Sequence, residues 1–91
     1  DAVFVSGDER ALGAYRAIQE AGLKIPGDVA VMGIDNIRTG QYYHPPITTI
    51  DQSIPSFVEH AFDILFKQLE NNQTPARRVL ITPVVVERES V

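Results

Sequence analysis

The sequence predicts an α/β fold in which a parallel sheet is flanked by helices, and two observations lead to this prediction. Runs rich in β-branched residues alternate along the chain with segments whose apolar residues recur every three or four positions. The run at 29–34 is apolar throughout, as expected of a strand in a sheet with helices over both faces. With 91 residues, the chain is long enough for one small core and no more.

The first half of the chain contains the signals of a strand, a helix and a second strand. A short buried strand is expected at 2–5, and a helix from about 9 to 21. Asp8 suits the N-cap of that helix, because its carboxylate can accept hydrogen bonds from the first free amides. Gly22 suits the left-handed position after the helix, and Pro26 lies where no helix could continue.

The second half repeats the alternation. A polar and aromatic loop at 35–46 leads to a β-branched strand at 47–50. A second helix is expected from Ser53 or Pro55 to about Glu70, ended by residues 71–75. Two short strands, 79–82 and 84–87, are expected on either side of Pro83.

The composition excludes several classes of function. Because the chain has no cysteine, a disulfide scaffold and a thiolate metal or redox site are ruled out. Its net charge of −4 at pH 7 has the wrong sign for a surface that binds DNA phosphates. No apolar run approaches the ~20 residues of a membrane helix. No nucleophile elbow, phosphate loop or zinc-binding motif is present, so we expect no catalytic residue, no metal and no cofactor.

Polar side chains follow the predicted strands, where parallel α/β sheets bind their ligands. These are Asp8, Asp35 and Gln52, and such hydrogen-bonding groups suit a small ligand rich in hydroxyls or amides. Helix capping is the simpler interpretation of Asp8. Asp35 fits turn chemistry and ligand binding equally well, because no helix clearly starts there.

Two aromatic residues stand in the loop at 35–46. Tyr42 and Tyr43 cannot both be buried easily there. Packing against the same chain is one interpretation, and a subunit interface is the other, because aromatic residues are enriched in interfaces.

Four linked motifs resemble the C-terminal part of the LacI/GalR family of transcription regulators. They are DERALGA at 8–14, GLKIPGDVAVMGIDN at 22–36, PPITTIDQ at 45–52 and VERES at 86–90. Together they span almost the whole chain, in order. None of the motifs alone would be specific.

The resemblance implies part of a periplasmic-binding-protein-like type I fold, in which two lobes enclose a ligand. Residues 1–52 would belong to the second lobe, 53–78 would form the helix crossing to the first lobe, and 79–91 would form the C-terminal strands. The family implies a cytoplasmic homodimer that responds to a sugar or similar effector. It binds operator DNA through an N-terminal helix-turn-helix, which this chain lacks. Neither a membrane nor a cofactor is implied.

The resemblance also implies site residues. Asp35 matches the aspartate that hydrogen-bonds effector hydroxyls, Gln52 matches a position lining the cleft, and Ile54 matches a neighbouring apolar contact. Gly7, directly before Asp8, stands where several sugar-binding relatives have asparagine. This difference removes a bidentate contact to a typical hexose or pentose.

The family's dimer interface corresponds to Tyr43 and Leu12, which favours the interface interpretation for Tyr43 and its neighbour Tyr42. Two rival functions remain at this stage. A periplasmic sugar-binding transport receptor would share the same lobes. A ligand-free interaction module would leave the polar strand-end residues unexplained.

Overall fold

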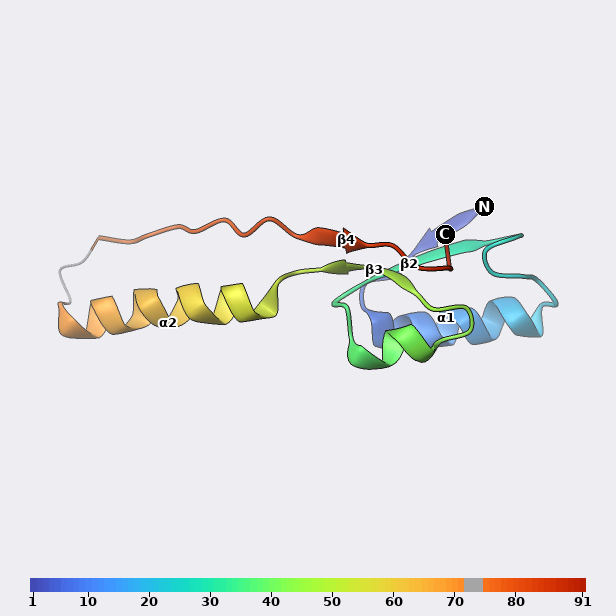
Figure 1. Ribbon diagram of the computed structural model, residues 1–91, viewed down its shortest axis with the longest axis horizontal. Helices are drawn as coiled ribbons and strands as arrows, with labels where there is room; N and C mark the ends of the chain where they lie inside the picture. The colour runs from blue at the N-terminus through green and yellow to red at the C-terminus, as the bar shows by residue number, and fades with distance from the viewer. Residues whose placement is uncertain (72–74) are drawn as a thin grey trace.

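The computed structural model describes residues 1–71 and 75–91, and within these ranges it contains one sheet with helices on one side (Figure 1). The strands are β1 (Ala2–Phe4), β2 (Ala30–Ile34), β3 (Thr48–Asp51) and β4 (Val84–Val86). The helices are α1 (Asp8–Glu20), the short 3-10 helix η1 (Arg38–Tyr42) and α2 (Ile54–Glu70). The predicted end of the second helix falls partly on residues 72–74, which lie outside the described residues.

The sheet has the order β1-β2-β3-β4. β1, β2 and β3 are parallel, as predicted, but β4 runs antiparallel to β3. The predicted parallel sheet is therefore formed by these three strands, and β4 adds an antiparallel strand that was not predicted from the sequence. The reason lies in the path of the chain: α2 leads away from β3, and the following segment returns alongside α2, so that β4 enters the sheet from the opposite direction (Figure 1).

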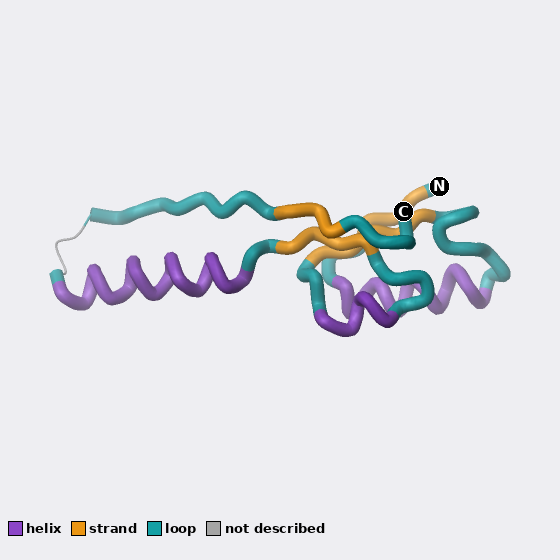
Figure 2. Tube along the Cα trace, in the orientation of Figure 1, coloured by secondary structure: helices purple, strands orange, loops and turns teal. Residues whose placement is uncertain are grey.

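The strand predicted at 79–82 is not formed, whereas β4 occupies most of the one predicted at 84–87. Residues 79–82 lie beside α2, beyond the end of β3, where this sheet offers no strand edge (Figure 2). Pro83, which lacks a backbone donor, precedes β4 and separates the paired from the unpaired part of this segment.

The core lies between α1 and the middle of the sheet. Its buried side chains are Ala11, Tyr15, Val31 and Ile47. Both α1 and η1 lie on the same side of the sheet, so the expectation that helices cover both faces is wrong for the described residues (Figure 1). The burial of β2 alternates accordingly along the strand, and Phe4 of β1 remains 58% exposed.

The buried Ser90 connects the C-terminal residues to the sheet through hydrogen bonds. The Ser90 hydroxyl donates to the carbonyl oxygen of Val31 at 2.6 Å and accepts from the backbone N–H of Thr48 at 2.7 Å. The N–H of Val31 donates to the backbone oxygen of Ser90 at 2.8 Å. Ser90 thereby links β2 and β3 and holds the end of the chain against them.

The helix boundaries agree with the prediction, but the cap of α1 does not. α1 begins at Asp8 and its N-cap residue is Gly7, with no side-chain capping bond. The Asp8 carboxylate turns away from its own helix toward the sheet, as described below. Gly22 adopts φ +74°, the left-handed conformation expected after the helix.

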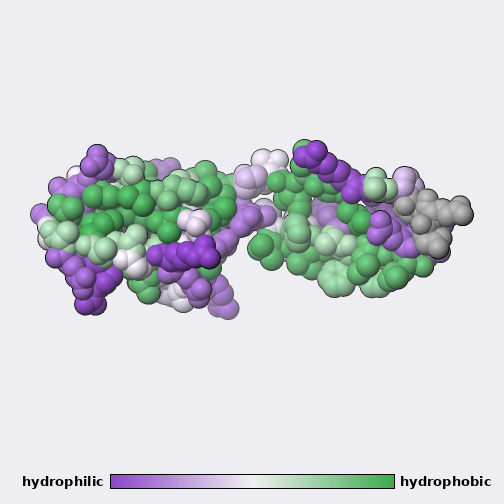
Figure 3. Space-filling model, turned by 180° about the vertical axis from the view of Figure 1, so that it is seen from behind, coloured by the Kyte–Doolittle hydropathy of each residue, from purple (hydrophilic) through white to green (hydrophobic). Residues whose placement is uncertain are grey.

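α2 forms an arm, and the molecule is 59 Å long but only about 20 Å across. None of the α2 side chains is buried, although many are apolar. Apolar residues gather on this half of the molecule in Figure 3. The largest exposed apolar side chains of α2 are Ile54, Phe57, Val58, Phe62, Leu65, Phe66 and Leu69. No helix among the described residues has the length and apolarity needed to cross a membrane.

Candidate functional site

Three of the predicted site residues come together at the carboxyl edge of β1, β2 and β3. Asp35 directly follows β2 and Gln52 directly follows β3. The Gln52 side-chain amide donates to Oδ1 of Asp35 at 2.7 Å. A Cβ built on Gly7, which follows β1, would lie 3.6 Å from the other carboxylate oxygen of Asp35. Gly7 therefore borders the carboxylate closely, and the parallel topology brings the ends of the three strands to one edge of the sheet.

The backbone of the Asp35 loop is unusual. Asp35 has φ 114° and Asn36 has φ 50°, a left-handed region that residues other than glycine rarely adopt. The N–H of Asp35 still donates to the carbonyl oxygen of Ile50 at 2.9 Å, so the loop continues the pairing of β2 with β3. Such strained residues persist only where surrounding contacts hold them, and they concentrate at ligand-binding sites.

A hollow of about 190 Å³ opens beside Asp35. Its lining consists of Ser6, Gly7, Glu9, Arg10, Asp35 and Ile37. Arg10 was not predicted from the sequence. It lies in the first turn of α1, three positions after Gly7, and its guanidinium donates to the backbone oxygen of Ser6 at 2.6 Å. Its sequence context offers no signal, because a charged residue in the first turn of a helix is usually a surface residue.

The predicted residue Ile54 lies apart from this hollow. It opens α2, its side chain is 53% exposed, and it does not line the space beside Asp35. Gln52 borders a second hollow of about 360 Å³, between the sheet end and the segment that returns from α2. The structure therefore brings together Gly7, Asp35 and Gln52, and places Ile54 at the start of the arm.

The Asp35 loop is connected to the end of β3 and to the segment that follows β4. The Asn36 side chain donates to Asp51 Oδ2 at 3.0 Å and accepts from the Arg88 guanidinium at 2.7 Å. Asp51 also accepts from the backbone N–H of Ser53 at 2.7 Å. These two hydrogen bonds, first from Ser53 and then from Asn36, lower the pKa of Asp51 because they favour its ionised form.

Asp8 lies behind the loop and is fully buried. Its Oδ1 accepts from the Thr49 hydroxyl at 2.7 Å, and its Oδ2 accepts from the backbone N–H of Ile37 at 3.1 Å. Both oxygens thus bind groups of this chain, in contrast to the exposed Asp35 carboxylate.

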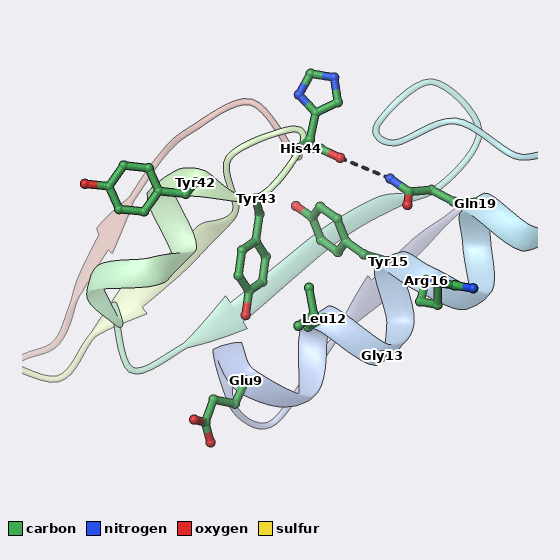
Figure 4. Close-up of a pocket in the computed structure, with 9 residues that line it drawn as sticks. All are labelled: Glu9, Leu12, Gly13, Tyr15, Arg16, Gln19, Tyr42, Tyr43 and His44. Atoms are coloured by element: carbon green, nitrogen blue, oxygen red, sulfur yellow. Dashed lines mark hydrogen bonds between the residues drawn. The ribbon is translucent and has the colours of Figure 1, made fainter.

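A separate hollow of about 640 Å³ lies between α1 and η1, over the residues predicted for the dimer interface (Figure 4). Leu12 is 56% exposed and Tyr42 is 79% exposed. Tyr43 is half-buried, and its ring meets that of Tyr15 edge-on at a centroid distance of 5.5 Å. Burial raises the pKa of the Tyr43 hydroxyl, and the negative charges of Asp8 and Glu9 add to the shift. Tyr43 therefore packs on its own chain, whereas Tyr42 and Leu12 project from it.

In residues 1–71 and 75–91, no group of three histidine, aspartate or glutamate side chains is arranged to hold a metal ion. The polar side chains at the site are hydrogen-bonding groups. The Asp35 carboxylate and the Arg10 guanidinium line a small polar hollow, and the Gln52 amide donates to that carboxylate. Such groups can orient a ligand that carries hydroxyls.

Residues 1–91, the whole chain, match the family described as periplasmic binding protein-like domain. The chain belongs to the periplasmic binding protein-like domain family. Among its relatives, the HTH-type transcriptional repressor PurR of Salmonella paratyphi B is 42% identical over 90 residues. The alignment covers 99% of the chain and 26% of PurR, so the chain spans about a quarter of the length of the curated relatives it matches.

Solved structures of LacI-type regulators have a fold similar to that of this chain. A LacI family transcriptional regulator from Enterococcus faecalis V583 with bound ribose superposes with a TM-score of 0.91 at 31% identity, covering 98% of the chain and 33% of the regulator. The lac repressor dimer bound to operator and the anti-inducer ONPF superposes with a TM-score of 0.87 at 36% identity, covering 98% and 27%. The predicted α/β fold and the resemblance to LacI-type regulators are thereby confirmed.

Proposed function

We propose that this chain is the effector-binding and dimerisation segment of a LacI-family transcriptional repressor that responds to a small polar ligand such as a sugar. The observation that supports this most directly is the cluster at the carboxyl edge of the sheet. An exposed Asp35 carboxylate, oriented by Gln52 and bordered by the side-chain-free Gly7, faces a polar hollow. In this proposal Asp35 and Gln52 bind ligand hydroxyls, Asp8 supports their loop from behind, and Ile54 adds an apolar contact from the start of α2.

The proposed lobe boundaries are 1–52 for the second lobe, 53–78 for the helix that crosses to the first lobe, and 79–91 for the C-terminal strands. The arm supports this division, because an α2 without a single buried side chain needs apolar partners that the sheet does not supply. We propose that the first lobe of the repressor supplies them, and that the effector binds between the lobes.

The proposed mechanism is a switch with no catalytic step. An effector that binds one arrangement of the lobes more tightly shifts the repressor toward it, and operator affinity follows by linkage. Operator DNA would be bound by a helix-turn-helix outside this segment, in a cytoplasmic homodimer whose contacts include Leu12, Tyr42 and Tyr43. A transport receptor is the weaker alternative, because the relatives reported above are named as transcriptional regulators.

Calorimetric titration of the full-length protein with ribose, and then with a panel of mono- and disaccharides, tests the proposal. We expect one sugar to bind, and Asp35→Asn to weaken its binding by about 1.5–3 kcal/mol, because a charged hydrogen-bond acceptor is lost. Asparagine tolerates the left-handed backbone of this loop, so the substitution changes charge with little added strain. Asp28→Asn, in an exposed turn, is the matched control. Equal affinities of the Asp35→Asn variant and the unaltered protein would remove Asp35 from the site.

A further inference from the structure

Asp8 is a buried carboxylate whose contacts extend in two directions. Its side chain is fully buried, and no lysine or arginine among the described residues forms an ion pair with it. A buried charge without a cation is unfavourable unless hydrogen bonds compensate for the lost water. The Thr49 hydroxyl and the Ile37 amide supply such bonds, and the N-terminal end of α1 adds a favourable dipole.

In one direction, Asp8 holds the loop that carries Asp35. Ile37, whose N–H binds Asp8 Oδ2, is only two residues beyond Asp35. Thr49 binds Asp8 Oδ1 through its hydroxyl, and the same hydroxyl accepts from the N–H of Asn36 at 3.3 Å. Asp8 therefore engages both amides that follow Asp35, one directly and one through Thr49. These bonds account for how the loop keeps its left-handed backbone.

In the other direction, Asp8 contacts Tyr43, which lies on the same face as Leu12 and Tyr42. The Tyr43 hydroxyl donates to the backbone oxygen of Asp8 at 3.0 Å. Figure 4 shows the Tyr43 hydroxyl pointing to the start of α1, whereas the Tyr42 hydroxyl points away from the helix. Among the described residues, Tyr43 donates to Asp8 and the neighbouring Tyr42 hydroxyl points away from the helix, which makes Tyr42 its natural control.

The position of the carboxylate is also fixed by β2. A Cβ on Gly33 would lie 2.0 Å from Asp8 Oδ1, so the carboxylate occupies space that any side chain at residue 33 would fill. Two elements and one loop thus meet at a single residue: α1, which carries Asp8; β2, which leaves room for it; and the Asp35 loop, which binds it.

We propose that Asp8 is a positioning residue that joins the Asp35 loop to the Leu12, Tyr42 and Tyr43 face, so that a change at either one alters the other. This inference rests on the proposed function only in identifying the loop with effector binding and the face with dimerisation. The physical link itself consists of three hydrogen bonds, from Tyr43, Thr49 and Ile37, to one residue.

Amide hydrogen exchange of the full-length protein, followed by NMR without any added sugar, tests the link. We expect Tyr43→Phe, which keeps the ring and removes the hydroxyl, to speed exchange at Asn36 and Ile37 at least threefold. Tyr42→Phe is the matched control and should leave both rates within a factor of 1.5, roughly the scatter expected when no hydrogen bond is lost. Asp8→Asn alters the carboxylate that binds Thr49 and Ile37 directly. It should therefore speed hydrogen exchange at the same two amides by more than Tyr43→Phe does.

Two results would overturn the proposal. One is an unchanged rate at Asn36 and Ile37 in Tyr43→Phe. The other is an acceleration that disappears when the protein is diluted, because it would then reflect subunit contacts and not the bond to Asp8. Since no sugar is present, a failed sugar titration would refute the proposed function without altering these rates.

Discussion

Asp35 shows how far single residues can be interpreted from sequence. Its place directly after an apolar strand predicts that it lies at the ligand-binding edge, and the structure puts it there. Its bond to Gln52, 17 residues further on, depends on the register of β2 with β3, which no local pattern fixes. Arg10 was missed because in the sequence it is an ordinary surface residue of a helix.

Asp8 was predicted as a helix cap, and its observed position differs for a physical reason. A carboxylate at the start of a helix usually accepts from that helix's own amides. Here the hydroxyl of Thr49 and the amide of Ile37 compete for it, and both come from segments distant in sequence. Tertiary partners of this kind cannot be inferred from one helix alone.

At the residue scale, Asp51 predicts a pH dependence of stability. Its pKa is lowered in the folded state, so it stabilises the fold above its ordinary pKa of about 3.9, and this contribution is lost as the pH falls through the lower folded value. We expect Asp51→Asn to reduce the free energy of unfolding at pH 7, and the difference from the unaltered protein to shrink below about pH 4. Urea denaturation at pH 7 and pH 3 measures it. A difference that stays constant or grows toward acid would contradict the assignment.

At the scale of elements, α1, β2, β3 and α2 follow closely from local signals. Periodicity, Gly22 after α1 and β-branched runs in the strands are properties of short segments, and the structure retains them. The direction of β4 and the uncovered face of the sheet are not local properties. They depend on where α2 leads the chain and on which residues surround it.

The packing of α1 against β2 predicts opposite effects for two glycine substitutions. Gly33→Ala should destabilise the fold by about 1–3 kcal/mol, because its Cβ would collide with the buried Asp8 carboxylate. Gly13→Ala should stabilise it by about 0.5–1 kcal/mol, because a Cβ there meets nothing within 4 Å and alanine favours the helix. Chemical denaturation of both variants measures these changes. Equal effects of the two substitutions would show that Asp8 is not packed against β2 as described.

At the scale of the whole molecule, the sequence patterns predict the fold class, and only the resemblance extends the interpretation to regulation. Composition and periodicity place polar groups at a sheet edge, and many proteins have such an edge. Four motifs in fixed order indicated a resemblance to LacI/GalR regulators, which the similarity to PurR and to the lac repressor confirms. Periodicity alone does not say what covers α2; the resemblance implies that it crosses to the first lobe, and within this chain its apolar side chains remain exposed.

The face between α1 and η1 predicts a self-association that one substitution should abolish. Leu12→Arg places a charge beside Tyr42 and Tyr43, and desolvating that charge in an apolar contact is unfavourable. We expect the full-length protein to sediment as a dimer and the Leu12→Arg variant as a monomer. Leu23→Arg, at an exposed site outside this hollow, is the matched control and should remain dimeric. A Leu12→Arg variant that still dimerises would place the interface elsewhere.

The central claim is that this segment belongs to a DNA-binding regulator, and the sequence encoded upstream of Asp1 tests it most directly. The proposal predicts an open reading frame that starts with a helix-turn-helix and continues through a first lobe into residue 1. A secretory leader at that start would contradict it and indicate a transport receptor, in which Asp35 could still bind a ligand but the chain would have no role at an operator.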